Sequence, residues 1–137
     1  MRVNYLWKIL LIKILKVMLG HSSGVSALAL LPNGELASCS FDKTIRLWNL
    51  KTGDQVRRTM KGHASCVSTL AVLHNGDLVS GSWDTTIRIW NVERCEVKKI
   101  MHGHNAKVIT LVVLENGDLA SGSWDRKVKI WDMKTGY

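Results

Sequence analysis

The chain has 137 residues, of which 46% are apolar and 22% are charged, and its formal net charge is +8. This composition is typical of one compact domain and excludes disordered, collagen-like and low-complexity chains. The three cysteines, Cys39, Cys66 and Cys95, form no CxxC pair, which excludes a disulfide framework or zinc knuckle and favours a reducing, intracellular compartment, cytoplasmic or nuclear.

The amino-terminal segment, residues 1–19, is mostly apolar but is interrupted by Lys8, Lys13 and Lys16. A lysine at the centre of a membrane-spanning helix costs about 2.5–3.5 kcal/mol, so the three together disfavour such a helix. The segment also lacks the small-residue cleavage site of a signal peptide. A spanning helix, a signal and a basic interfacial helix stay open as alternatives to the strands proposed below.

Three copies of one unit follow, at residues 20–61, 62–102 and 103–137. The pairs Gly-His, Asn-Gly and Trp-Asn or Trp-Asp each recur at spacings of 42 and 41 residues. Within every unit His to Ser is 17, Ser to Asp is 4 and Asp to Trp is 6, whereas Trp to the next His is 15 and then 14. A constant interior with one variable connection predicts a repeated supersecondary unit.

Each unit predicts short strands. The first strand is apolar and β-branched, an Asn-Gly pair predicts a two-residue type I′ hairpin to the second, and a tight turn with an Asp leads to an alternating third. A more polar fourth strand follows in two units and is lacking in the last. The first strands are 25–31, 67–73 and 108–114; the second 36–40, 78–82 and 119–123; the third 45–48, 87–90 and 128–131; the fourth 55–60 and 96–101. Four antiparallel strands every forty-odd residues predict an all-β fold with one propeller blade per unit.

The segment before Gly20 aligns with the fourth strands. Residues 14–18 match 56–60 and 97–101, and Trp7 precedes His21 by 14 residues, the spacing that separates Trp90 from His104. We therefore expect residues 1–19 to form a partial blade with a third and a fourth strand.

The motifs Gly-His, Asn-Gly, Leu-Ala-Ser-Gly-Ser-Trp-Asp and Lys-Ile-Trp-Asp resemble the WD-repeat (Trp-Asp repeat) β-propeller family over residues 20–132. Asn49 and Asn91 stand where the family has Asp, and Cys39 where it usually has Gly. The resemblance implies a partial β-propeller of three four-stranded antiparallel blades plus an N-terminal partial blade. It also implies a non-catalytic interaction scaffold or adaptor that binds a protein or peptide on the top face.

Three blades do not close a ring, because propellers have about four to eight. The chain is then a fragment of a longer propeller without independent function, or one of two copies that close a six-bladed ring, or an open monomer. In the second case residues 14–18, as the closing strand, complete the last blade of the other copy.

A His-Ser-Asp-Trp set recurs at constant spacing in all three units. The sets are His21, Ser38, Asp42 and Trp48; His63, Ser80, Asp84 and Trp90; His104, Ser121, Asp125 and Trp131. A catalytic Ser-His-Asp arrangement is needed once per domain, so three copies favour a structural role over catalysis. The resemblance implies that each set, called a tetrad below, forms a hydrogen-bonded chain across its blade.

Neither a metal nor a cofactor is expected. His102-x-His104 has ligand-like spacing, but His104 belongs to a tetrad, and the chain has no phosphate-binding Gly-rich loop.

The resemblance places the residue before each tetrad Asp on the top face, near the central channel. These residues are Phe41, Trp83 and Trp124, and the further partner-binding positions that it implies are Ser26, Cys66, Ser68, Lys107 and Ile109. Three rings rimmed by basic side chains suit a peptide with an acidic or phosphorylated element. The alternative is that the rings only pack against neighbouring blades.

Basic residues gather on or beside the fourth strands, at the outer rim: Lys13, Lys16, Arg57, Arg58, Lys61, Lys98 and Lys99. One interpretation is a belt for nucleic acid or phosphoinositide lipid. We favour the other, that charge on outer edge strands opposes aggregation between sheets, which disfavours nucleic acid and membrane as partners.

Overall fold

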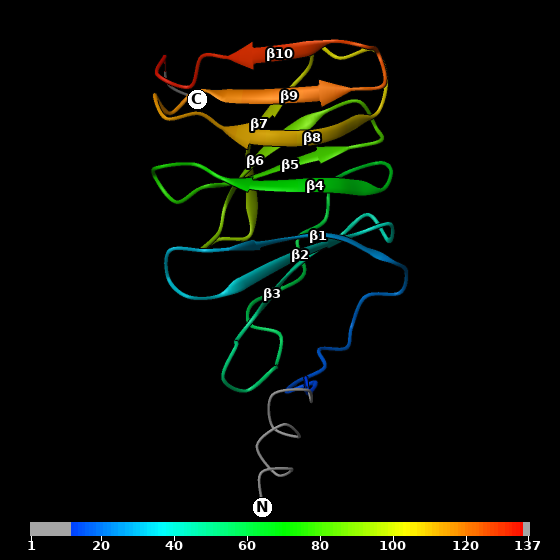
Figure 1. Ribbon diagram of the computed structural model, residues 1–137, viewed down its shortest axis with the longest axis vertical. Coiled ribbons are helices and arrows are strands. Elements are labelled where there is room, and N and C mark those ends of the chain that lie inside the picture. The colour runs from blue at the N-terminus through cyan, green and yellow to red at the C-terminus, as the bar shows by residue number, and fades with distance from the viewer. Residues whose placement is uncertain (1–11, 136–137) are drawn as a thin grey trace, which may run out of the picture.

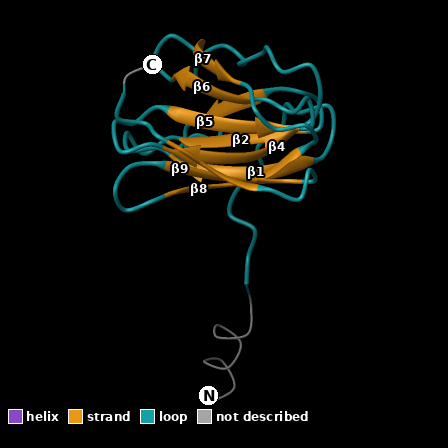
Figure 2. Cartoon of the chain, turned by 90° about the horizontal axis from the view of Figure 1, so that it is seen from above, coloured by secondary structure: helices purple, strands orange, loops and turns teal. Residues whose placement is uncertain are grey.

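The computed structural model describes residues 12–135, which form ten strands in three antiparallel sheets and, within that range, no helix (Figure 1, Figure 2). The first sheet contains β1 (Val25–Leu30), β2 (Leu36–Ser40) and β3 (Ile45–Trp48); the second β4 (Val67–Val72), β5 (Leu78–Ser82), β6 (Ile87–Asn91) and β7 (Glu96–Met101); the third β8 (Val108–Val113), β9 (Leu119–Ser123) and β10 (Val128–Trp131). Each sheet is a meander in which strands adjacent in sequence are paired. The predicted all-β fold of repeated antiparallel blades is confirmed.

The three sheets stand side by side along an arc, with their first strands β1, β4 and β8 adjacent (Figure 1). One apolar cluster fills the space between the first and second sheets, where Leu47 and Met60 pack with Leu70. A second cluster fills the space between the second and third sheets, around Ile89 and Leu111. Each sheet is therefore stabilised mainly by burial against its neighbours, as expected of a stacked repeat.

The Asn-Gly turns differ from the prediction. The Leu31 N–H donates to the Glu35 carbonyl and the Gly34 N–H donates to the Leu31 carbonyl, both at 2.9 Å, so the loop has three residues. Gly34 has a φ of 87°, but Asn33 is not among the residues with positive φ, and a type I′ turn needs positive φ at both central positions. The predicted type I′ hairpin is wrong: the chain makes a type I turn followed by a left-handed glycine, and the other two Asn-Gly loops do the same.

The fourth strand predicted at residues 55–60 is reduced to two isolated bridges, Trp48 with Gln55 and Ile45 with Met60. Between them Arg57 has a φ of 57°, which breaks the extended backbone. The reason is the extra residue between Trp and the next His in this unit, which the chain accommodates as a bulge. The second unit lacks that residue and forms the predicted strand, β7.

Residues 12–20 form no strand, so the structure differs from the prediction for residues 14–18. A strand needs a paired edge, and the third strand expected around Trp7 lies outside the described residues. Most of the apolar segment weighed above as a membrane span lies outside them too. Within residues 12–135 no helix is long and apolar enough to cross a membrane.

Candidate functional site

The four side chains of each tetrad meet in one hydrogen-bonded chain. In the second unit Nδ1 of His63 lies 2.7 Å from Oδ2 of Asp84, and Nε2 of His63 lies 2.7 Å from Oγ of Ser80. The indole N–H of Trp90 donates to the same Oγ at 2.8 Å. The first and third units repeat this geometry with every corresponding distance between 2.6 and 2.8 Å.

The partners fix the direction of these bonds. An indole N–H only donates, so the serine oxygen accepts from Trp and its own hydroxyl proton is directed to Nε2 of the histidine. A carboxylate only accepts, so the other ring nitrogen carries the proton and donates to Asp. Each tetrad joins the loop before the first strand, the second strand, the turn after it and the end of the third strand.

The tetrad aspartates also accept hydrogen bonds from backbone N–H groups. Oδ2 of Asp42 accepts from the backbone N–H of Ser22 at 3.0 Å, and Oδ1 accepts from the backbone N–H and hydroxyl of Thr44. Burial opposes ionisation of Asp42, but these bonds and the one from His21 outweigh it and hold the pKa of its carboxyl below the usual value. The same balance lowers the pKa of Asp84, and it lowers that of Asp125 to about 2.

The sequence analysis missed the threonine two residues after Asp. Thr86 repeats the contacts of Thr44, whereas the third unit has Lys127 there and keeps only the backbone bond. The recurrence of Thr at this spacing in two of three units was the signal that could have found it.

The glycine before each tetrad histidine gives the tryptophan room. A Cβ atom at Gly103, whose φ is 156°, would lie 2.9 Å from Cη2 of Trp131, and one at Gly20 would lie 2.7 Å from Nη1 of Arg46 and 3.2 Å from Cη2 of Trp48. A larger residue would push the indole away from its serine, which explains the Gly-His pair at the start of each unit.

This geometry does not suit catalysis. All three tetrad serines are buried, and each hydroxyl oxygen is held between an indole and an imidazole. A nucleophilic serine needs a free approach to its oxygen, and a substrate would first have to displace the tryptophan. The tetrads are best explained as internal supports of the blades.

The three predicted top-face rings line up along the arc, and we call Phe41, Trp83 and Trp124 the aromatic ladder. The ring centroids of Phe41 and Trp83 are 5.3 Å apart, and those of Trp83 and Trp124 are 6.5 Å apart. Nζ of Lys107 lies 3.7 Å from the Trp83 centroid and 4.5 Å from the Trp124 centroid, within the range of cation–π attraction. Phe41 and Trp124 are exposed and Trp83 is half-buried between them.

The other predicted partner-binding residues lie apart from the ladder or play different roles. The hydroxyl of Ser26 donates to the Val67 carbonyl, and that of Ser68 donates to the Val108 carbonyl, so both serines join one first strand to the next. Cys66 reaches the ladder only through its carbonyl, which accepts from the Trp83 backbone N–H at 3.0 Å. Ile109, at the position of these serines in β8, has no hydroxyl to form such a bond.

No group of three or more metal-binding side chains occurs within residues 12–135. His104 is held by its tetrad, and the three cysteines are unpaired. Burial raises the pKa of the Cys39 thiol to about 11, which keeps it protonated and unreactive at neutral pH.

The chain consists of antiparallel meanders packed side by side, and each contains a hydrogen-bonded His-Ser-Asp-Trp set. This arrangement defines a segment of a β-propeller. The model of the WD40 family, described as "WD domain, G-beta repeat", matches residues 12–49, 54–91 and 95–132. The chain therefore belongs to the WD40 repeat family.

Solved and curated proteins agree with this assignment. The crystal structure of the WD40 beta propeller domain of Doa1 matches with a TM-score of 0.78 and 36% sequence identity, over 83% of this chain and 38% of that one. Two curated relatives are each a tRNA (guanine-N(7)-)-methyltransferase non-catalytic subunit wuho: one from Drosophila willistoni is 51% identical over 41 residues, and one from Drosophila mojavensis is 60% identical over 40. The matched part is about 30% of this chain and 10% of each relative, so the chain corresponds to a small part of their length.

Proposed function

We propose that this chain is a non-catalytic interaction scaffold that binds a peptide through the aromatic ladder. WD40 propellers generally serve as platforms for protein partners, and the ladder is the feature of this chain that fits such a role. The observation on which the proposal depends is a row of three neighbouring rings beside a cation, in which the central ring, Trp83, is only half-buried. Rings that only packed against neighbouring blades would be covered, whereas Trp83, which has a neighbouring sheet on each side, is only half-buried.

The chemistry of the ladder indicates what it would bind. Trp83 and Trp124 offer apolar faces, which are common anchors in protein interfaces. The ammonium group of Lys107, held over both rings, offers a positive charge that suits an anionic group on the peptide. An extended peptide with an apolar side chain next to an acidic or phosphorylated residue matches this arrangement.

The experiment is a binding measurement on arrayed acidic, phosphorylated and neutral peptides. We expect Trp83→Ala with Trp124→Ala to abolish binding, and Lys107→Glu to abolish binding of the acidic peptides in particular. Arg94→Glu, an equal charge change at an exposed position in the loop between β6 and β7, is the control and should change little. If the double tryptophan variant instead collapses the thermal melt seen by circular dichroism, the rings serve packing and the proposal fails.

The basic rim is a weaker candidate. Arg57 is paired with Glu35 and with Glu93, Arg58 lies 3.1 Å from Glu96, and Nζ of Lys98 lies 2.5 Å from Asp77. Charges that are neutralised within the chain contribute less to binding of phosphates, which disfavours a belt for nucleic acid or phosphoinositides.

The curated relatives support membership of a complex. Each is named as the non-catalytic subunit of an enzyme, which fits a chain whose tetrads are buried supports. We propose that this chain likewise assembles with other subunits, and that it does so in an intracellular compartment where its unpaired thiols stay reduced.

A further inference from the structure

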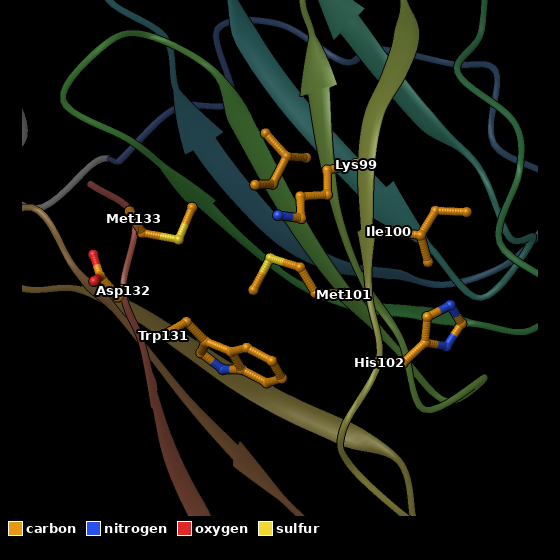
Figure 3. Close-up of a pocket in the computed structure, with 8 residues that line it drawn as sticks. Lys99, Ile100, Met101, His102, Trp131, Asp132 and Met133 are labelled. Carbon is orange, nitrogen blue, oxygen red and sulfur yellow. The ribbon is translucent and has the colours of Figure 1, made fainter. Parts of the chain in front are cut away.

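A pocket of about 260 Å³ lies between the second and third sheets at the outer rim (Figure 3). Met101 comes from β7, Trp131 from the end of β10 and Met133 from the residues just after it, and all three side chains face the same space in Figure 3. Ile89 completes an apolar lining, and Lys99, Ile100, His102 and Asp132 lie at its border. A pocket with an apolar floor at an unpaired sheet edge is typical of a contact site.

The same place between the first and second sheets is filled. There Cys95 is buried in the cluster with Leu47 and Met60, and Val97 from β7 packs against it. Those two side chains belong to the fourth strand of the second sheet and its approach. The third sheet has no fourth strand among the described residues, so the corresponding place next to β10 is left open.

Apolar residues of β10 are also exposed, because the third sheet has no following sheet among the described residues. Val128 is 77% exposed and Ile130 is 60% exposed, whereas their equivalents Ile87 and Ile89 in β6 are fully buried. In the first two sheets such residues pack against the first strand of the next sheet: Ile45 with Val67, and Ile87 with Val108.

The chain contains a segment, residues 12–18, that corresponds in sequence to the missing fourth strand. Ile12 and Ile14 align with Cys95 and Val97, and they are 98% and 84% exposed. Trp7 precedes His21 by 14 residues, the same spacing as in the second unit, where β7 forms. The segment can therefore pair as β7 does, without the bulge found at Arg57.

The segment lies at the opposite end of the arc from β10 (Figure 1), so it cannot reach the pocket of its own chain. The first sheet beside it is open too: Val25 and Leu28 are 55% and 60% exposed, although their equivalents Val67 and Leu70 are buried. One end of the arc therefore exposes a third strand, β10, and the other exposes a first strand, β1. Inside the chain, surfaces of these two kinds pack against each other where neighbouring sheets meet.

We propose that a second copy of this chain occupies both ends. Residues 14–18 of one copy pair antiparallel with β10 of the other, and Ile12 and Ile14 fill its pocket. The β6–β7 pairing then sets the register: Val128 with Met18, Lys129 with Val17, Ile130 with Lys16 and Trp131 with Ile14.

The remaining contact completes the assembly. Val25 and Leu28 of one copy cover Val128 and Ile130 of the other. The contact joins unlike surfaces, and two such contacts close a ring of two chains and six sheets. This inference goes beyond peptide binding and does not depend on the ladder.

The first test is the mass in solution across micromolar concentrations, by size-exclusion chromatography with light scattering. We expect twice the chain mass of 15.4 kDa. Ile14→Lys places a charge in the pocket and should reduce the species to one chain. Val17→Glu is the matched control, because its equivalent Ile100 is 40% exposed and its cross-strand partner would be Lys129, and it should leave the pair intact. A single chain at all concentrations, or growth beyond two chains, would overturn the proposal.

The second test checks the register. Chains with Val17→Cys mixed with chains with Lys129→Cys should form an intermolecular disulfide on oxidation, since paired strand residues lie within the Cα distance that a disulfide spans. Chains with Lys13→Cys, four residues away, should not cross-link to Lys129→Cys, and each variant alone measures the background from native cysteines. Equal cross-linking of both mixtures would contradict the register.

Discussion

Replacing Ser80 by alanine tests whether the tetrads support the fold. The change removes the oxygen that accepts from the Trp90 indole and contacts Nε2 of His63, and all three residues are buried. Each buried polar atom left without a partner costs about 1–3 kcal/mol. The loss of unfolding free energy should therefore be roughly 2–6 kcal/mol, a large share of the 5–15 kcal/mol typical of a domain.

The third unit offers a matched comparison. Ser121→Ala breaks the same two bonds, but Trp131 is half-buried and lines the pocket, whereas Trp90 is buried, so we expect the freed N–H of Trp131 to find water more easily. We expect this variant to lose about 1–2 kcal/mol less than Ser80→Ala. Urea unfolding followed by circular dichroism at one fixed chain concentration measures both, provided that the m-values agree. A loss below about 0.5 kcal/mol for Ser80→Ala would refute the structural role, whereas equal losses for the two variants would mean that the Trp131 N–H is shielded from water as well as that of Trp90.

Three further predictions concern packing, backbone and pH. Gly81→Ala should lower the unfolding free energy by about 1–3 kcal/mol, because a Cβ there would lie 2.7 Å from Cγ1 of Val108 and 2.8 Å from Cγ2 of Thr69. Thr69→Ala should recover only the part due to Thr69, and an unchanged unfolding free energy of Gly81→Ala in urea melts would contradict the crowding. Thr85 has a φ of 76°, so Thr85→Asn should stabilise the chain by about 1 kcal/mol, and a lower urea midpoint would contradict that. Hydrogen bonds hold the folded-state pKa of the tetrad aspartates below that of the unfolded chain, to about 2 for Asp125. The stabilisation from these ionised aspartates is therefore present at neutral pH and should be lost as pH falls from about 4 towards 2. An unfolding free energy that stayed constant over this range would contradict the lowered pKa values.

Local pattern and repeat spacing were enough to predict most strands and the members of each tetrad. The second strands, such as Leu36–Ser40, begin and end where the pattern places them, and the first strands are one residue shorter because Leu31 and its equivalents close the turn. These features follow from residues that lie within one unit.

The features that sequence reasoning missed depend on contacts beyond the motif. The first unit has Cys39 where the other two have glycine, and the structure pairs it with Ala27, whereas Gly81 pairs with Thr69. A smaller residue opposite thus makes room for the larger one. The hydroxyls of Ser26 and Ser68, assigned to a partner from the resemblance, act between units, which no pattern within one unit could indicate.

The serine bonds between first strands have a consequence for how firmly the units hold together. Each junction inside the chain combines apolar packing with a hydroxyl directed to a main-chain carbonyl at the inner edge. A junction formed beyond β8 would have Ile109 at that place and would lack this hydroxyl bond at its inner edge. A ring of two chains would thus separate between its chains before it separated within either one, and could exchange subunits while each chain stayed folded.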